Sequence, residues 1–92
     1  MLKITENDIY RGSTKIGYIT ANDVYSPDGN KLGYFTSNDI YDVRGNKLGY
    51  VEGNRIKMMD GRSIDVEENN KSIVGGPYST IARAAIRLLC GD

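Results

Sequence analysis

The chain contains no histidine and only one cysteine, and both shortages restrict its chemistry. Histidine is the usual general base near neutral pH and the commonest metal ligand, so Ser-His and Cys-His nucleophile pairs are excluded. Cys90 has no second cysteine with which to form a disulfide or a structural zinc site, and we interpret it as a small buried hydrophobe. No cofactor is indicated. The low cysteine content favours a reducing, cytoplasmic compartment.

The chain also lacks an excess of charge and any long apolar run. Its twelve basic and twelve acidic residues cancel, so no basic field is present that would bind phosphate backbones. No stretch approaches the roughly 18 consecutive apolar residues of a transmembrane helix. The N-terminus has no apolar core typical of a signal peptide. We therefore expect neither nucleic acid nor a membrane as a partner.

Three near-identical segments follow one another along the chain. Each begins with Asn-Asp, continues with Ile or Val and then Tyr, and ends in Leu-Gly-Tyr or Ile-Gly-Tyr; they start at Asn7, Asn22 and Asn38. A degenerate fourth copy starts at Asn54, so positions 7, 22, 38 and 54 are spaced by 15, 16 and 16 residues. Each copy of a tandem repeat forms the same local structure and stacks on its neighbours. The repeat therefore predicts architecture rather than chemistry.

The fourth copy departs from the other three at its surface positions. It has Arg55 in place of Asp, Lys57 in place of Tyr and Asp65 in place of Gly, while its apolar positions and turn glycine survive. Terminal units of repeat arrays are often atypical. We expect the fourth copy to keep the fold, with its last strand over residues 64–66, and to lose a surface property.

Each unit is typical of a β-hairpin. Turn-forming Pro, Asp, Gly and Asn residues separate its two apolar segments. About sixteen residues hold two strands of five or six residues but not a βαβ crossover. We therefore predict an all-β domain of antiparallel hairpins over residues 1–74, followed by one C-terminal helix within residues 75–92. Residues 72–74 are expected to lie beside residues 2–5 and to close the array.

A glycine lies inside the return strand of each regular copy, at Gly17, Gly33 and Gly49. Glycine weakens a strand but lets another group approach the backbone closely. We expect an aromatic ring to cover each of these positions, with the tyrosines of the outgoing strands as candidates. Approach of a ligand is the alternative.

The segment from residue 78 to residue 90 is predicted to be a helix. Ser79 or Thr80 can cap its start, Pro77 suits the entry to the helix and Gly91 can end it. A helix this apolar requires a wide buried face, either on the β array or against the same helix of a second chain, which would make a homo-oligomer. Arg83 and Arg87 form the polar stripe. They are candidates to pair with the acidic residues Asp65, Glu67 and Glu68.

The Asn-Asp pairs are one candidate site. Asn and Asp form turns readily because their side chains bond nearby backbone groups, and this is the structural interpretation. The functional interpretation is a ring of amides and carboxylates that binds a cation or a polyol. The residues are Asn7, Asn22, Asn38, Asp8, Asp23 and Asp39.

The repeated tyrosines are the second candidate site. Tyr10, Tyr25 and Tyr41 recur at one position of the repeat, and a second set recurs in the return strands. Ring faces beside amides and carboxylates would suit a sugar or a peptide. Packing between hairpins is the alternative interpretation. Because the fourth copy has lysine here, a four-fold identical site is not expected.

The repeated line Asn-Asp-Ile/Val-Tyr, followed by Gly-Asn-Lys-Leu-Gly-Tyr, resembles the bacterial four-fold β-flower domains over about residues 3–69. The resemblance implies four tandem β-hairpins around a pseudo-four-fold axis. The family has no established activity, so the resemblance transfers no catalytic residues.

Three functional hypotheses follow. The leading one is a non-catalytic binding or scaffolding module, so we do not expect an enzyme. The first alternative is a small carboxylate-dependent, glycosidase-like hydrolase, which requires two carboxyl groups about 5–10 Å apart. The second alternative is a purely structural oligomerisation unit that docks through its C-terminal helix.

Overall fold

The computed structural model describes residues 2–75 and 78–90, and the predicted roles of Pro77 and Gly91 lie outside these residues. The described chain is mostly β, with ten strands in one sheet and two helices. The strands are β1 (Leu2–Thr5), β2 (Asp8–Arg11), β3 (Thr14–Thr20), β4 (Asp23–Tyr25), β5 (Lys31–Phe35), β6 (Asp39–Asp42), β7 (Lys47–Glu52), β8 (Arg55–Met58), β9 (Ser63–Asp65) and β10 (Ile73–Val74), and the helices are α1 (Val66–Ser72) and α2 (Thr80–Cys90).

The strand order follows the chain from β1 to β9, and every consecutive pair is antiparallel, as predicted. β10 then pairs with β1 in parallel, with Leu2 opposite Ile73. The prediction that residues 72–74 lie beside residues 2–5 is therefore confirmed. The hairpins β2–β3, β4–β5 and β6–β7 each contain a register shift, which falls after Ile9, Val24 and Ile40 respectively. This shared irregularity shows that the three regular copies have the same backbone plan.

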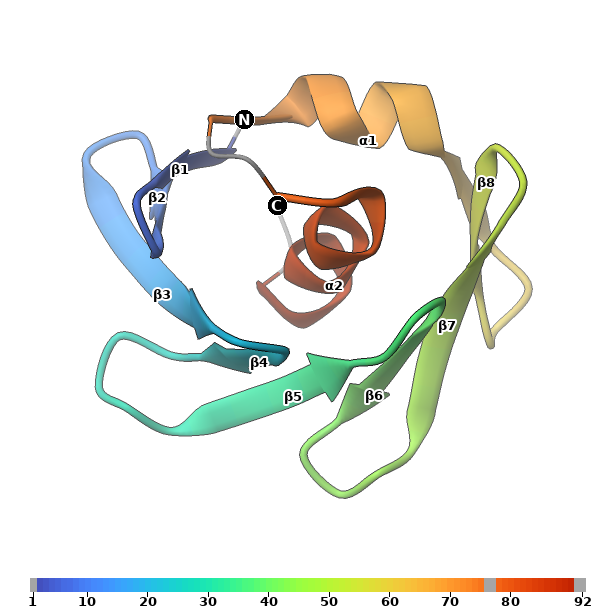
Figure 1. Cartoon of the computed structure of the whole chain (residues 1–92), viewed down its shortest axis with the longest axis horizontal. Coiled ribbons are helices and arrows are strands. Elements are labelled where there is room, and N and C mark those ends of the chain that lie inside the picture. Colours follow the sequence, from blue (N-terminus) through green and yellow to red (C-terminus); the bar gives the residue numbers. More distant parts are fainter. Residues whose placement is uncertain (1, 76–77, 91–92) are drawn as a thin grey trace.

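The sheet curls around α2, which lies inside the curve (Figure 1). Isoleucine or valine at the centre of each outgoing strand points inward and is fully buried, as Ile9, Val24, Ile40 and Ile56 illustrate. α2 contributes buried alanines and Ile86 to the same core. Of the two predicted locations for the helix, the structure has the one on the chain's own sheet. Self-association through α2 stays a prediction, and it would require these covered residues to become exposed.

The strand glycines provide room for α2 and for a neighbouring strand, not for an aromatic ring. A Cβ atom at Gly49 would lie 2.6 Å from the carbonyl oxygen of Lys57 and 3.0 Å from Leu88 Cδ1. At Gly33 the helix residue is Leu89, and at Gly17 it is Cys90. The expectation of a covering tyrosine was wrong because the inward space at each glycine is filled from the helix. Three successive residues of α2 thus meet three successive hairpins.

α1 is a second helix that the sequence analysis did not predict. The fourth return strand was expected over residues 64–66, but β9 ends at Asp65 and α1 begins at Val66. Asp65 caps the helix, since its Oδ1 accepts a hydrogen bond of 3.0 Å from the Glu67 amide. Glu67 and Glu68 in the first turn complement the helix dipole. α1 lies across the opening of the curved sheet, between β9 and β10 (Figure 1).

The start of α2 is held by polar contacts. Ser79 caps it, with its Oγ accepting from the Ala82 amide at 3.3 Å, as predicted. Arg83 donates from Nε to the Tyr78 carbonyl at 3.1 Å and from Nη2 to the Gly75 carbonyl at 3.0 Å. In the last turn of the helix, Arg87 Nη1 donates to the Ser72 Oγ at 3.2 Å. No helix among the described residues is long and apolar enough to cross a membrane.

Candidate functional site

The asparagines of the repeat lie in the turns between hairpins, and each one bonds through its main-chain carbonyl to the return segment of its own hairpin. The main-chain carbonyl of Asn7 accepts a hydrogen bond from the Ile19 amide at 2.8 Å. The residue before the asparagine is left-handed at Glu6 (φ 56°) and at Ala21 (φ 53°), which is typical of a tight turn. The same bond recurs in the later copies, from Phe35 to Asn22 at 3.0 Å, from Val51 to Asn38 at 2.8 Å and from Val66 to Asn54 at 2.9 Å.

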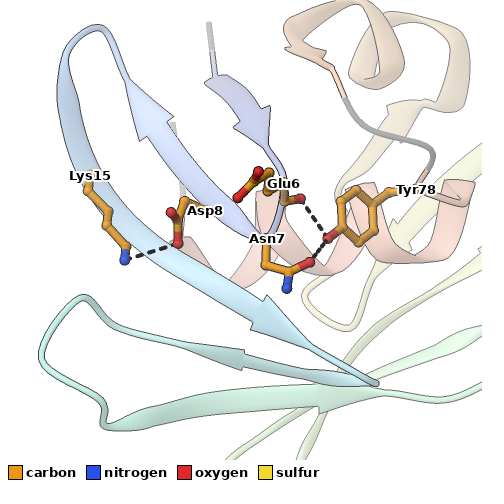
Figure 2. A network of polar contacts seen from close by, with 5 residues as sticks. All are labelled: Glu6, Asn7, Asp8, Lys15 and Tyr78. Carbon is orange, nitrogen blue, oxygen red and sulfur yellow. Dashed lines mark hydrogen bonds and ion pairs between the residues drawn. The ribbon is translucent and has the colours of Figure 1, made fainter.

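Each repeat aspartate forms an ion pair with a lysine of its own hairpin. Lys15 Nζ lies 3.0 Å from Asp8 Oδ1, as Figure 2 shows, and 5.2 Å from the centre of the Tyr18 ring. Such an ammonium group over an aromatic face is a cation–π contact. The second copy repeats it with Asp23, Lys31 and Tyr34, and the third with Asp39, Lys47 and Tyr50, each with an ion pair of 3.0 Å.

The predicted ring of carboxylates does not form. Each of the three aspartates is neutralised by its lysine, and α2 occupies the inside of the curved sheet. Among residues 2–75 and 78–90, no three Asp, Glu or Cys side chains are arranged to hold a metal ion. The structure therefore provides three separate ion pairs on the outer face in place of a single central cation site.

The repeated tyrosines pack between hairpins. Tyr18 of β3 stacks on Tyr25 of β4 with ring centres 5.0 Å apart and planes at 9°. Tyr34 of β5 stacks on Tyr41 of β6 in the same way, at 5.1 Å and 16°. The packing interpretation is confirmed for Tyr25 and Tyr41. Tyr10 lies instead opposite lysines on both neighbouring strands, in register with Lys3 and Lys15.

These side chains form a continuous outer surface, which we call the tyrosine belt. Along each outgoing strand the apolar residue is buried and the tyrosine after it is half-buried on the opposite face. The belt comprises Tyr10, Tyr18, Tyr25, Tyr34, Tyr41 and Tyr50 with Lys15, Lys31 and Lys47.

The ring faces of Tyr18 and Tyr34 are already in contact with neighbouring side chains. Tyr18 has Tyr25 on the β4 side, and the Lys15 ammonium is drawn toward β2 by Asp8. Tyr34 has the same environment one hairpin further on. A sugar that stacks on a ring face would have to displace one of these neighbours.

Tyr78 connects the segment before α2 to the first turn. Its Oη lies 2.9 Å from the Glu6 carbonyl oxygen and 2.7 Å from Asn7 Oδ1, as Figure 2 shows. Burial, and secondarily the negative charge of Asp8, raise the pKa of Tyr78 and keep it a donor. The side chain of Asn7 is therefore engaged within the chain. No sequence signal links these groups, because 71 residues separate them.

The described carboxyl groups with shifted pKa values do not favour acid catalysis. A hydrogen bond from Ser26 lowers the pKa of Asp28, and backbone amides lower those of Asp42 and Asp60. A hydrogen bond from Lys57 lowers the pKa of Glu52. A glycosidase-like general acid requires a raised pKa, and these four carboxyl groups lack that property.

Cys90 packs against the core as predicted, but it is half-buried and not fully buried. Burial raises the pKa of its thiol to about 11, and the thiolate is the nucleophilic form. Its Sγ lies 3.6 Å from the position that a Cβ atom at Gly17 would occupy.

A hollow of about 290 Å³ is lined by the start of β7, by the turn that joins β8 to β9 and by Leu88 of α2. The sequence analysis did not identify it. The signal available was the Met58-Met59 pair, which replaces Ser26-Pro27 and Asp42-Val43 of the preceding turns.

The chain matches no protein-family model, no curated protein and no solved structure. The resemblance to the β-flower domains therefore stays a prediction.

Proposed function

We propose that the chain is a non-catalytic protein-binding or scaffolding module that contacts its partner through the outer face of its sheet. The observation that carries this proposal is the threefold recurrence of one outward-facing unit, an aspartate–lysine ion pair over a tyrosine, on a sheet whose inside is filled by α2. The repeated chemistry therefore faces outward.

The state of the tyrosines favours a protein over a sugar as the partner. Stacked rings and paired lysines are held before binding, so little side-chain freedom is lost when a partner docks. Tyrosine is enriched at protein interfaces because it combines apolar area with a polar hydroxyl. A sugar platform would require free ring faces, and those of Tyr18 and Tyr34 are covered.

We further propose that the four hairpins are copies of one unit arranged with pseudo-four-fold symmetry about α2, as in a β-flower domain. Successive residues of an α-helix point about 100° apart, close to the angle of about 90° between four symmetric units. The contacts from Leu88, Leu89 and Cys90 to Gly49, Gly33 and Gly17 fit this arrangement. The lone thiol fits the proposed cytoplasmic setting.

Affinity capture with belt variants tests the function. The whole chain and a Tyr34→Ser/Tyr41→Ser variant are immobilised, exposed to lysate of the source cells, and the retained proteins are identified by mass spectrometry. An Arg44→Ser variant in an exposed turn is the control, and circular dichroism verifies that each variant is folded. We expect a set of proteins that the wild type and the control retain and the belt variant loses. Identical retention by all three, or no retention, would overturn the proposal.

A further inference from the structure

The hollow beside the fourth hairpin is mainly apolar, and its charged lining residues are two cations and one carboxylate, that of Asp60. Its volume is about 290 Å³, near the lower limit for ligand pockets and suited to one side chain rather than a whole ligand. It is lined by Lys47, Leu48, Met58, Met59, Asp60, Arg62 and Leu88.

The repeat supplies an internal comparison for the residues of this hollow. In the preceding turn, Asp42 Oδ1 accepts hydrogen bonds of 2.9 Å from the amides of Arg44 and Asn46. The equivalent residue of the fourth hairpin is Met58, which has no such acceptor. The backbone bond across the turn is nevertheless kept, from Met58 to the Arg62 carbonyl at 2.8 Å. The turn therefore does not require a methionine at position 58.

In the fourth hairpin the turn is capped by a different residue, Asp60. Asp60 Oδ1 accepts from the Arg62 amide at 3.1 Å. The side chains of Met58 and Met59 are thus free of a turn-forming role, and Met59 is 58% exposed. Methionine side chains are flexible and polarisable, and adapt to apolar groups of varied shape. Leu48 and Leu88 supply the rest of the apolar lining.

The rim carries two cations in exposed or half-exposed ion pairs. Arg62 Nε lies 2.8 Å from Asp60 Oδ2, and Lys47 Nζ lies 3.0 Å from Asp39 Oδ1. The Arg62 side chain is 75% exposed. Exposed surface pairs contribute little stability, so Arg62 can turn to a carboxylate of a bound partner at small cost.

We propose that this hollow binds one apolar side chain, of leucine or phenylalanine size, from a partner protein segment that has acidic residues beside it. The inference rests on the proposed function, and gives it a specific anchor point. The apolar lining receives the side chain, while Arg62 contacts a flanking carboxylate. Buried apolar anchors of this kind contribute much of the affinity of protein interfaces.

Methyl NMR on the whole chain tests the inference. The chain has three methionines, and ¹³C-methyl labelling makes Met58 and Met59 direct reporters of the hollow. The probe is a peptide with the order Glu-Asp-Leu-Phe-Glu-Asp. A peptide with the same Leu-Phe core between lysines tests charge, and octanoate tests whether a small apolar acid is the occupant.

The matched variants are Met59→Asp and Val43→Asp, which alter equivalent turn positions that are 58% and 56% exposed. A third variant, Met58→Asp, installs the residue that the preceding turn uses, so its fold has a precedent within the chain. We expect the acidic peptide to shift both methyl signals. We also expect Met59→Asp and Met58→Asp to weaken binding at least tenfold, and Val43→Asp to change it less than twofold.

Three results would overturn the inference: equal losses for Met59→Asp and Val43→Asp, equal binding of the lysine-flanked peptide, or methyl shifts with octanoate and none with the acidic peptide. If the peptide leaves the methionines unchanged while capture still depends on Tyr34 and Tyr41, the anchor is wrong and the proposed function stands. If the peptide binds at the hollow and belt variants retain the same proteins as wild type, the belt proposal fails instead.

Discussion

The third and fourth hairpins share the backbone bond that closes their turns, but only the third has a register shift between its strands, and their side chains make different contacts. In the third hairpin, Tyr41 stacks on Tyr34 and Asp42 caps the turn. The absence of a side chain at Gly49 leaves space for Leu88 of α2. In the fourth, Lys57 pairs with Glu52, and Met58 opens a hollow.

Where the fourth copy has a different residue from the other three, its local structure differs as well. The change to Asp at position 65 ends the strand and starts α1. The change to Met at position 58 removes a turn cap and creates apolar surface. Residues common to the copies build the sheet, whereas the departures create the features that only one copy has.

The largest expected effect comes from filling the glycine space of a regular hairpin. In Gly33→Ala the new methyl group would meet the Tyr41 carbonyl oxygen and lie 2.6 Å from Leu89 Cδ2. Overpacking of this kind lowers the free energy of unfolding by about 3 kcal/mol. Urea denaturation measures it.

The control for Gly33→Ala is Asp65→Ala, which changes the residue that stands in place of the glycine in the sequence of the fourth copy. This change removes only a helix cap and should cost about 1 kcal/mol. Equal losses for the two variants would show that the regular and fourth copies do not differ at this position.

A second prediction concerns α1, which has no counterpart in the regular hairpins. Asn69 is 1% exposed, and among the described residues neither its Oδ1 nor its Nδ2 has a hydrogen-bond partner. Asn69→Leu should raise the free energy of unfolding by about 1–2 kcal/mol, because the unpaired buried amide is replaced by an apolar group of similar size. Thermal and urea denaturation measure the change.

Asn69→Asp is the matched control, and should destabilise the chain because it places a carboxyl group in the same buried position. A loss of stability in Asn69→Leu would contradict the prediction, and would indicate that the amide is satisfied by bound water.

The sequence allowed much of the fold to be predicted, because the signals that specify it are periodic or local. The spacing of Asn7, Asn22 and Asn38 predicted the antiparallel hairpins, and Ser79 predicted the start of α2. α1 was missed although Asp65, Glu67 and Glu68 are a helix-start signal, because the repeat register was given precedence over capping.

The arrangement of the candidate site was less predictable because it depends on which face of the sheet each residue occupies. The Asn-Asp positions suggested a central ring, but a helix fills that space. The pairing of Asp8 with Lys15 follows from a register shift after Ile9, which no local pattern identified. The contact from Tyr78 to Asn7 joins opposite ends of the chain, and only tertiary packing determines it.

A third prediction compares the two kinds of contact between neighbouring hairpins. A double-mutant cycle on Tyr34 and Tyr41, with leucine at each position, should give a coupling energy of about 1 kcal/mol, because a stacked aromatic pair is lost. The same cycle on Tyr50 and Lys57, which occupy the equivalent positions next along the sheet, should give less. Urea denaturation of the wild type and the six variants supplies the energies. Equal coupling would mean that stacking contributes nothing beyond contact area.

The smallest expected effect is a difference in acid sensitivity between the capped turns. Backbone and side-chain hydrogen bonds from Asn46 lower the pKa of Asp42 below its usual 3.8. A carboxyl group with a lowered folded-state pKa stabilises the fold above its unfolded pKa, and this stabilisation is lost as pH falls through the folded-state pKa. Asp42→Asn should therefore reduce the fall in melting temperature below pH 3.8 and leave the slope near neutral pH unchanged.

Asp39→Asn is the control, since it changes a carboxyl group of the same strand that lies outside the turn. Melting curves from about pH 2 to pH 7 measure the difference, and a matching reduction in Asp39→Asn would contradict a role specific to the turn cap.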